Sequence, residues 1–173
     1  VGDGAGDLPR GEVVCGPGAE GSTLRLIARF TYLGREGAKP VPFESGARVH
    51  VMAGTAEVIG RIMLMEGDGP IAPGETRTVQ IRLEERLPVR SGDGLIVLAF
   101  SPVVLIGGGR VLLSRCRRSR ELMDGECSLL AALDVGDLAS AVAAWLGIQR
   151  LPVPAAVVAR ALDLSGAEVA KLL

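Results

Sequence analysis

The sequence RVHVMAGTAEVIGRIML, at residues 48–64, decides the fold that we expect for this chain. Apolar and polar residues alternate on both sides of a short break at Ala53-Gly54. The residues expected to share the inner face are Val49, Val51, Ala56, Val58, Gly60, Ile62 and Leu64. A period of two turns one face of a strand toward a core. The stretch therefore predicts two antiparallel strands joined by a tight turn.

The outer face of this strand pair is unusually polar, because it carries Arg48, His50, Glu57 and Arg61. Two interpretations stay open: a solvated strand face, or a surface that contacts a partner. Neither is catalytic, since the single histidine lies beside Arg48 with no nucleophile or paired carboxylate nearby in sequence. We therefore expect no enzymatic activity from this chain.

Short stretches with the same alternation surround the central pair. Strands are expected at 10–14, 24–33, 76–83, 95–100 and 106–113, with turns at 16–18 and 91–94 and a long loop at 34–46. In 76–83, Val79, Ile81 and Leu83 should point inward, and Thr78, Gln80 and Arg82 outward. Stretch 95–100 is apolar on both faces, which predicts a strand covered on both sides. Such strands, without helical patterns between them, predict a small antiparallel barrel or sandwich.

Three consecutive glycines, Gly107 to Gly109, precede a β-branched and leucine-rich run. A phosphate-binding loop would need glycines that open a helix. A bulge or a close backbone approach inside a barrel is the better prediction here.

The pattern becomes helical after a basic linker at 115–120. Asp137 can cap one helix, and 154–162 suits a second. Ser165 and Glu168 then form a capping box, with Leu164 packing on Val169 as a staple. Two short helices at this spacing fit a helix-turn-helix. Residues 121–173 hold 3 basic and 7 acidic residues, so we expect no sequence-selective nucleic-acid binding from this segment alone.

Composition limits the class of protein and the partners that this sequence can have. The 173 residues are 48% hydrophobic, enough for a packed core. Residues 24–120 hold 15 basic and 9 acidic residues between acidic flanks, which suits a polyanion-binding surface. Cys15, Cys116 and Cys127 are far apart and suit reduced thiols rather than zinc ligands or disulfides, so we expect a cytoplasmic protein. Because no apolar run approaches the roughly 20 residues needed to span a bilayer, we also expect no contact with a membrane. Because the chain begins at Val1, we expect it to be a piece of a longer protein.

Five segments together resemble the selenocysteine-specific elongation factor (SelB) family, within the wider elongation factor Tu group. They are RGEVVCGPG (10–18), LRLIARFTYL (24–33), ARVHVMAGTAEVIGRIMLMEG (47–67), APGETRTVQIRLEERLPVRSGD (72–93) and SPVVLIGGGRVL (101–112). The chain departs from the family at Leu105, usually threonine, and at Leu113-Ser114, where the family usually continues Asp-Pro.

The resemblance implies a two-domain β + α organisation. Residues 1–23 would end a preceding β-barrel domain and form a linker. Residues 24–114 would be a six-stranded antiparallel barrel like the third domain of elongation factor Tu. After the linker at 115–120, residues 121–173 would begin a winged-helix domain that this sequence leaves incomplete.

It also implies a function, namely delivery of selenocysteyl-tRNA to the ribosome at recoded UGA codons. GTP and magnesium would be bound by a GTPase domain outside this sequence, and an mRNA hairpin by winged helices further downstream, so we expect no cofactor here. In such factors the barrel leans on the acceptor and T stem of the tRNA, mostly through phosphate and sugar. The residues that match tRNA-contacting positions, or lie beside them on the same face, are Arg48, Thr55, Glu57, Arg61, Arg86, Ser101 and Pro102.

A rival hypothesis comes from a different functional class. The barrel would then be an interaction scaffold of another translational GTPase, holding a partner domain without binding RNA itself.

Overall fold

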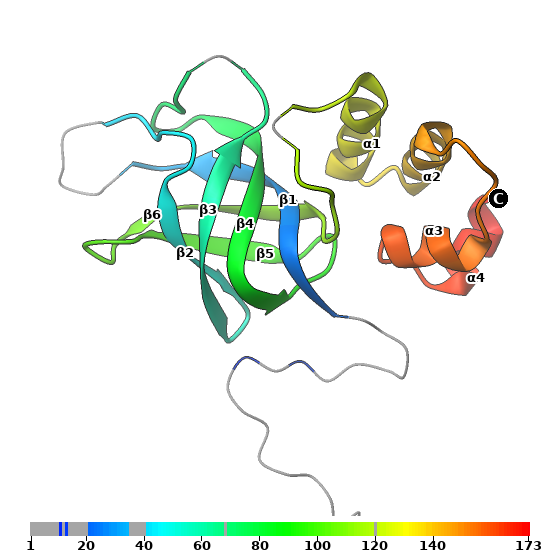
Figure 1. Cartoon of the computed structure of the whole chain (residues 1–173), viewed down its shortest axis with the longest axis horizontal. Coiled ribbons are helices and arrows are strands. Elements are labelled where there is room, and N and C mark those ends of the chain that lie inside the picture. Colours follow the sequence, from blue (N-terminus) through cyan, green and yellow to red (C-terminus); the bar gives the residue numbers. More distant parts are fainter. Residues whose placement is uncertain (1–10, 12, 14–20, 35–40, 68, 120) are drawn as a thin grey trace, which may run out of the picture.

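The computed structural model describes residues 11, 13, 21–34, 41–67, 69–119 and 121–173. Within these ranges, six strands precede four helices (Figure 1). They are β1 (Ser22–Tyr32), β2 (Arg48–Ala53), β3 (Ala56–Leu64), β4 (Thr76–Pro88), β5 (Gly94–Ala99), β6 (Leu105–Leu113), α1 (Asp124–Val135), α2 (Leu138–Ile148), α3 (Ala155–Ala161) and α4 (Gly166–Leu172). The strand expected at 10–14 and the turn at 16–18 lie outside the described residues, apart from Gly11 and Val13, which are not in a strand.

The strands close into an antiparallel barrel with the order β1-β4-β3-β2-β5-β6. Its central hairpin pairs Val51 with Val58 and Ala53 with Ala56. Gly54 makes the turn with φ of 55°, a left-handed conformation that glycine adopts at little cost. The predicted strand pair and the predicted barrel are therefore both confirmed.

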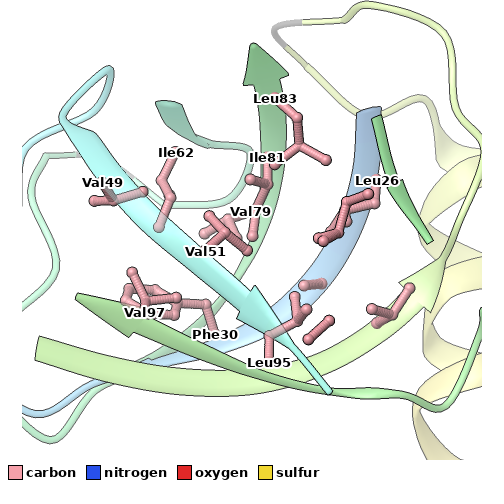
Figure 2. Close-up of a cluster of buried hydrophobic side chains, with 14 of the residues drawn as sticks. Leu26, Phe30, Val49, Val51, Ile62, Val79, Ile81, Leu83, Leu95 and Val97 are labelled. Atoms are coloured by element: carbon pink, nitrogen blue, oxygen red, sulfur yellow. The ribbon is translucent and has the colours of Figure 1, made fainter. Parts of the chain in front are cut away.

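The barrel interior is filled by the inward residues of every strand. Figure 2 shows Leu26, Val51, Ile62 and Ile81 directed into this space. All four are fully buried. Phe43 packs against Phe30 and Tyr32 with ring centroids 5.7 and 5.4 Å apart. Apolar burial of this kind contributes roughly 25 cal/mol per Å² and holds the strand faces in their orientation.

The glycine run lies where β6 passes closest to its neighbours. A Cβ atom added to Gly108 would stand 2.8 Å from the carbonyl oxygen of Leu95, and one on Gly109 would overlap the carbonyl oxygen of Arg29. Only a residue without a side chain fits at these positions. The predicted close backbone approach is confirmed.

The helices gather on one side of the barrel (Figure 1). They share a second apolar cluster with the barrel wall, to which Ile27 and Leu113 contribute from β1 and β6, and Leu129 and Val169 from α1 and α4. As predicted, Asp137 caps α2 by accepting from the Ser140 N–H. No helix in the described part of the chain is long and apolar enough to cross a membrane.

The capping box at Ser165 and Glu168 is also present at the start of α4. Its staple partners behave as predicted, since Val169 is fully buried and Leu164 packs on the same cluster. Together with α3, the short α4 forms the helix pair that the sequence predicted.

One burial prediction was wrong. Ile96 was expected to be covered, yet it is 51% exposed, since no element of the described residues packs on the outer face of β5 at that point. Thr78 and Gln80 occupy outward positions of β4 as predicted, but they are only 2% and 0% exposed, and the linker after β6 covers Gln80. Both findings concern what lies on the outside of the barrel, which strand periodicity does not encode.

Candidate nucleic-acid interface

Arg48 begins β2 on the outer wall of the barrel. Its Nε and Nη2 donate to the two carboxylate oxygens of Glu84 at 2.9 and 2.7 Å. This paired hydrogen bond lowers the pKa of Glu84 below its usual value. The guanidinium also lies over Phe100, 4.2 Å from the ring centroid. A cation over an aromatic face gains electrostatic attraction, so both contacts hold Arg48 in place.

Phe100 supports a second residue of the same surface. The His50 ring stacks on it with centroids 5.5 Å apart. His50 Nδ1 also lies 2.8 Å from Oε1 of Glu57 on the next strand. Arg48, His50 and Phe100 therefore form a fixed platform with one flat aromatic ring and polar groups around it.

Arginines stand in register across four neighbouring strands. Arg48 on β2 pairs with Arg61 on β3, Arg61 pairs with Arg82 on β4, and Arg82 pairs with Arg25 on β1. All four occupy outward positions, because the residues beside them in each strand are core residues such as Val49, Ile62, Ile81 and Leu26. We call Arg48, Arg61, Arg82 and Arg25 the arginine row. Directly opposed like charges repel each other in a sheet, and hydrogen bonds from Arg48 to Glu84, from Arg61 to the Gly46 carbonyl and from Arg82 to the Ser119 carbonyl offset this repulsion.

The chain corner after β5 adjoins this row. Ser101 and Pro102 are joined by a cis peptide bond and are exposed. Arg48, Phe100 and Ser101 line a groove of about 530 Å³ that reaches Phe43 and Tyr32. Val103 and Leu105 follow with 58% and 52% of their surfaces exposed. The groove itself is lined mainly by apolar and aromatic residues, with Arg48 and Glu44 as the charged residues of its lining.

The residues predicted to contact tRNA are only partly brought together. Arg48 and Arg61 are cross-strand neighbours, and Ser101 with Pro102 lies at the adjoining corner. Glu57 joins them through its contact with His50.

The other two predicted residues lie elsewhere on the barrel. Thr55 is in the hairpin turn and lines a separate depression with Asp93 and Gly94. It stands at the far end of β2 from Arg48, about 20 Å away by the rise of a strand. Arg86 is directed toward the start of β1, where its Nη1 lies 3.4 Å from the Ser22 carbonyl oxygen. The sequence-based set therefore spans more than one surface.

Sequence reasoning missed four residues of this surface: Phe100, Arg25, Arg82 and Arg118. Arg25 and Arg82 had a weak signal, because both fall at outward positions of their predicted strands. Their alignment with Arg48 and Arg61 depends on strand order and register, which the alternation does not fix. Arg118 comes from the linker, which curls back against β4 and β1.

Residues 33–118 match the family described as selenocysteine-specific elongation factor, beta-barrel domain. The chain is 31% identical over 106 residues to the selenocysteine-specific elongation factor of Desulfomicrobium baculatum, covering 61% of this chain and 16% of that protein. It is 33% identical over 90 residues to elongation factor Tu 2 of Streptomyces avermitilis, covering 51% of this chain and 23% of that protein. The chain thus spans less than a quarter of the length of either relative.

Proposed function

We propose that this chain, whose residues 33–118 match the β-barrel domain of selenocysteine-specific elongation factors, binds selenocysteyl-tRNA for delivery to the ribosome at recoded UGA codons. The chain carries a translation-factor barrel domain. The proposal that this barrel binds tRNA is supported by the surface around Arg48.

One observation carries the proposal. Arg48 and Arg61 stand directly opposite each other on the outer wall, beside the platform of Phe100 and the Ser101 corner. Glu84 compensates the Arg48 guanidinium through two hydrogen bonds, and Arg61 donates to the Gly46 carbonyl oxygen at 2.9 Å. The pair together with Glu84 therefore retains one net positive charge that can attract an anion. RNA stems are recognised mainly through phosphate and ribose contacts, for which fixed guanidinium groups are well suited. The aromatic and apolar groove next to them can accept a base or ribose face.

The remaining partners are proposed from the family alone. We propose that GTP and magnesium are bound by a GTPase domain of the longer protein, and that an mRNA hairpin is bound by winged helices beyond this sequence. Residues 121–173 would begin the first winged helix, which the α3–α4 pair with its Ser165 capping box supports. Residues 24–114 would be the barrel domain, with residues 1–23 ending the preceding one.

The test is a filter-binding titration of the 173-residue chain with a selenocysteine tRNA transcript over a range of salt concentrations. Arg48→Ala with Arg61→Ala should weaken binding about tenfold and flatten the dependence of log affinity on log salt by about 1 to 2. The thermal midpoint should fall only modestly, because Arg61 is exposed and the half-buried Arg48 loses a surface ion pair with Glu84, a contact worth about 0 to 1 kcal/mol.

The control is Arg90→Ala with Arg150→Ala, which removes the same charge from exposed positions outside the arginine row. It should leave both affinity and salt slope nearly unchanged. If the Arg48/Arg61 variant binds the tRNA as the parent does, this face is not the tRNA site. The scaffold hypothesis would then be favoured, and the exposed apolar residues around Ser101 would become its contact surface.

A further inference from the structure

We propose that the arginine row is a track for RNA phosphates that continues across the barrel wall to the linker, where Arg25, Arg82 and Arg118 hold a second group of phosphates. This inference rests on the proposed function and extends it, because it places RNA contact well away from the Ser101 corner. It also brings the RNA to the junction between the barrel and the helices.

The far end of the row forms a shallow depression in the barrel wall. Its volume is about 400 Å³, and four arginines contribute to its lining. The lining residues are Leu24, Arg25, Arg61, Arg82, Leu83, Glu84 and Arg118. Arginine is suited to bidentate contact with phosphate oxygens, so a concave site with four guanidinium groups matches an anionic backbone.

The single carboxylate in this lining does not cancel the positive charge. Glu84 accepts two hydrogen bonds from Arg48, so its charge is already compensated by the neighbouring end of the row. Arg61 adds a further attraction that helps to hold the pKa of Glu84 below its usual value. Once the Arg48–Glu84 pair is set aside, the depression retains an excess of cations.

Hydrogen bonds to the linker fix the far end of the track in advance. Arg82 donates from Nε to the Gln80 side chain at 2.8 Å and from Nη2 to the Ser119 carbonyl at 2.7 Å. Gln80, itself fully buried, donates to the Arg117 carbonyl at 2.8 Å. These bonds attach the linker to β4 on both sides of Arg118. The Arg82 guanidinium and the backbone at Arg118 are therefore held in position before RNA arrives, which lowers the entropic cost of binding.

The extent of the row favours a nucleic-acid backbone over a small anion. Four strands spaced about 4.8 Å apart carry the row over roughly 14 Å, and Arg118 extends it further. A single phosphate would engage only one or two of these groups. A tRNA stem presents successive phosphates along a rigid surface, and it can lie across a shallow, open depression without entering it.

The experiment uses Arg25→Ala with Arg118→Ala in the 173-residue chain. Both residues are exposed, so the variant should fold as the parent does, which its thermal midpoint will verify. With the selenocysteine tRNA transcript, affinity should fall about tenfold and the salt slope should flatten by about 1 to 2. The Arg90/Arg150 variant again serves as the charge-matched control.

Hydroxyl-radical footprinting of the same complex locates the contacts. The Arg25/Arg118 variant should lose protection at the riboses beside one group of tRNA phosphates, and the Arg48/Arg61 variant at the riboses beside a different group. Loss of protection at the same riboses in both variants would overturn the track. So would unchanged binding by Arg25/Arg118 alongside weakened binding by Arg48/Arg61, although the proposed tRNA function would then stand. If neither variant is weakened, both proposals fall.

Discussion

Gly109 shows at the scale of one residue why this barrel closes. It pairs with Phe30 of β1 and Leu95 of β5, the neighbours of β6 on its two sides. There the Arg29 carbonyl occupies the space in which a side chain would lie. The constraint is steric contact with backbone, which cannot move without breaking the ladder hydrogen bonds between β1 and β6.

We predict that Gly109→Ala destabilises the protein by about 1 to 3 kcal/mol or more, the range seen when a methyl group is forced into packed structure. Urea denaturation followed by far-ultraviolet circular dichroism measures the loss. The matched control is Gly94→Ala, because a Cβ at Gly94 would meet nothing within 4 Å. Equal stability of the two variants would contradict the close-approach interpretation.

At the scale of elements, the hairpin and the helix caps are each specified locally. The β2–β3 pair needs only its alternation and Gly54. Helix α4 is only 7 residues long, too short to be stable by itself in water. Its stability therefore comes from the Ser165 cap, whose side chain accepts from the Glu168 N–H, and from burial of Val169 against the other helices.

Ser165→Ala should cost about 1 kcal/mol, the usual effect of removing an N-cap side chain. Hydrogen exchange at the amides of α4 should accelerate, while exchange in the barrel strands stays as in the parent. Ser128→Ala is the control, since Ser128 is exposed within α1, where alanine is a better helix former. A similar acceleration in both variants would exclude a specific role for the cap.

At the scale of the whole molecule, the helices pack against one wall of the barrel. Side chains of β1 and β6 join those of α1 and α2 in one apolar cluster. Polar contacts reinforce it, since Asp163 accepts from the Ser91 N–H at 2.9 Å and Arg110 contacts Asp134. The two parts should therefore unfold together rather than separately.

Ile27 offers a test, because it lines a cavity of about 300 Å³ with Leu129 and Trp145. Ile27→Ala should lower stability by about 2 to 5 kcal/mol, the usual cost of truncating a buried isoleucine. Trp145, the single tryptophan, reports on the helices by fluorescence, and its urea transition should shift together with the circular dichroism signal. Ile96→Ala, on the exposed face of β5, should have little effect. An unshifted tryptophan transition in Ile27→Ala would show that the helices are stable independently.

Much of the fold followed from the sequence, because the signals are local. Alternation placed the strands, Gly54 and the glycine run placed a turn and a close approach, and Asp137 and Ser165 placed two helix starts. Each depends on residues within a few positions of one another, and their physical effects act over the same distance.

The composition of the candidate surface was decided only by the tertiary structure. Arg48 was predicted from the family resemblance and Arg61 from its place on the same outward face, and the two are cross-strand neighbours in the structure. Arg82 joined them because β4 pairs with β3, and Arg25 joined because β1 is the other neighbour of β4 in the barrel, although β1 and β4 are far apart in the chain. Arg118 was added by a linker that folds back over Gln80. The order of the strands and the segments that cover the outside of the barrel depend on how the whole chain packs, which local periodicity does not record. The sequence by itself therefore determined the strands, and the tertiary structure determined which of their charged residues lie together.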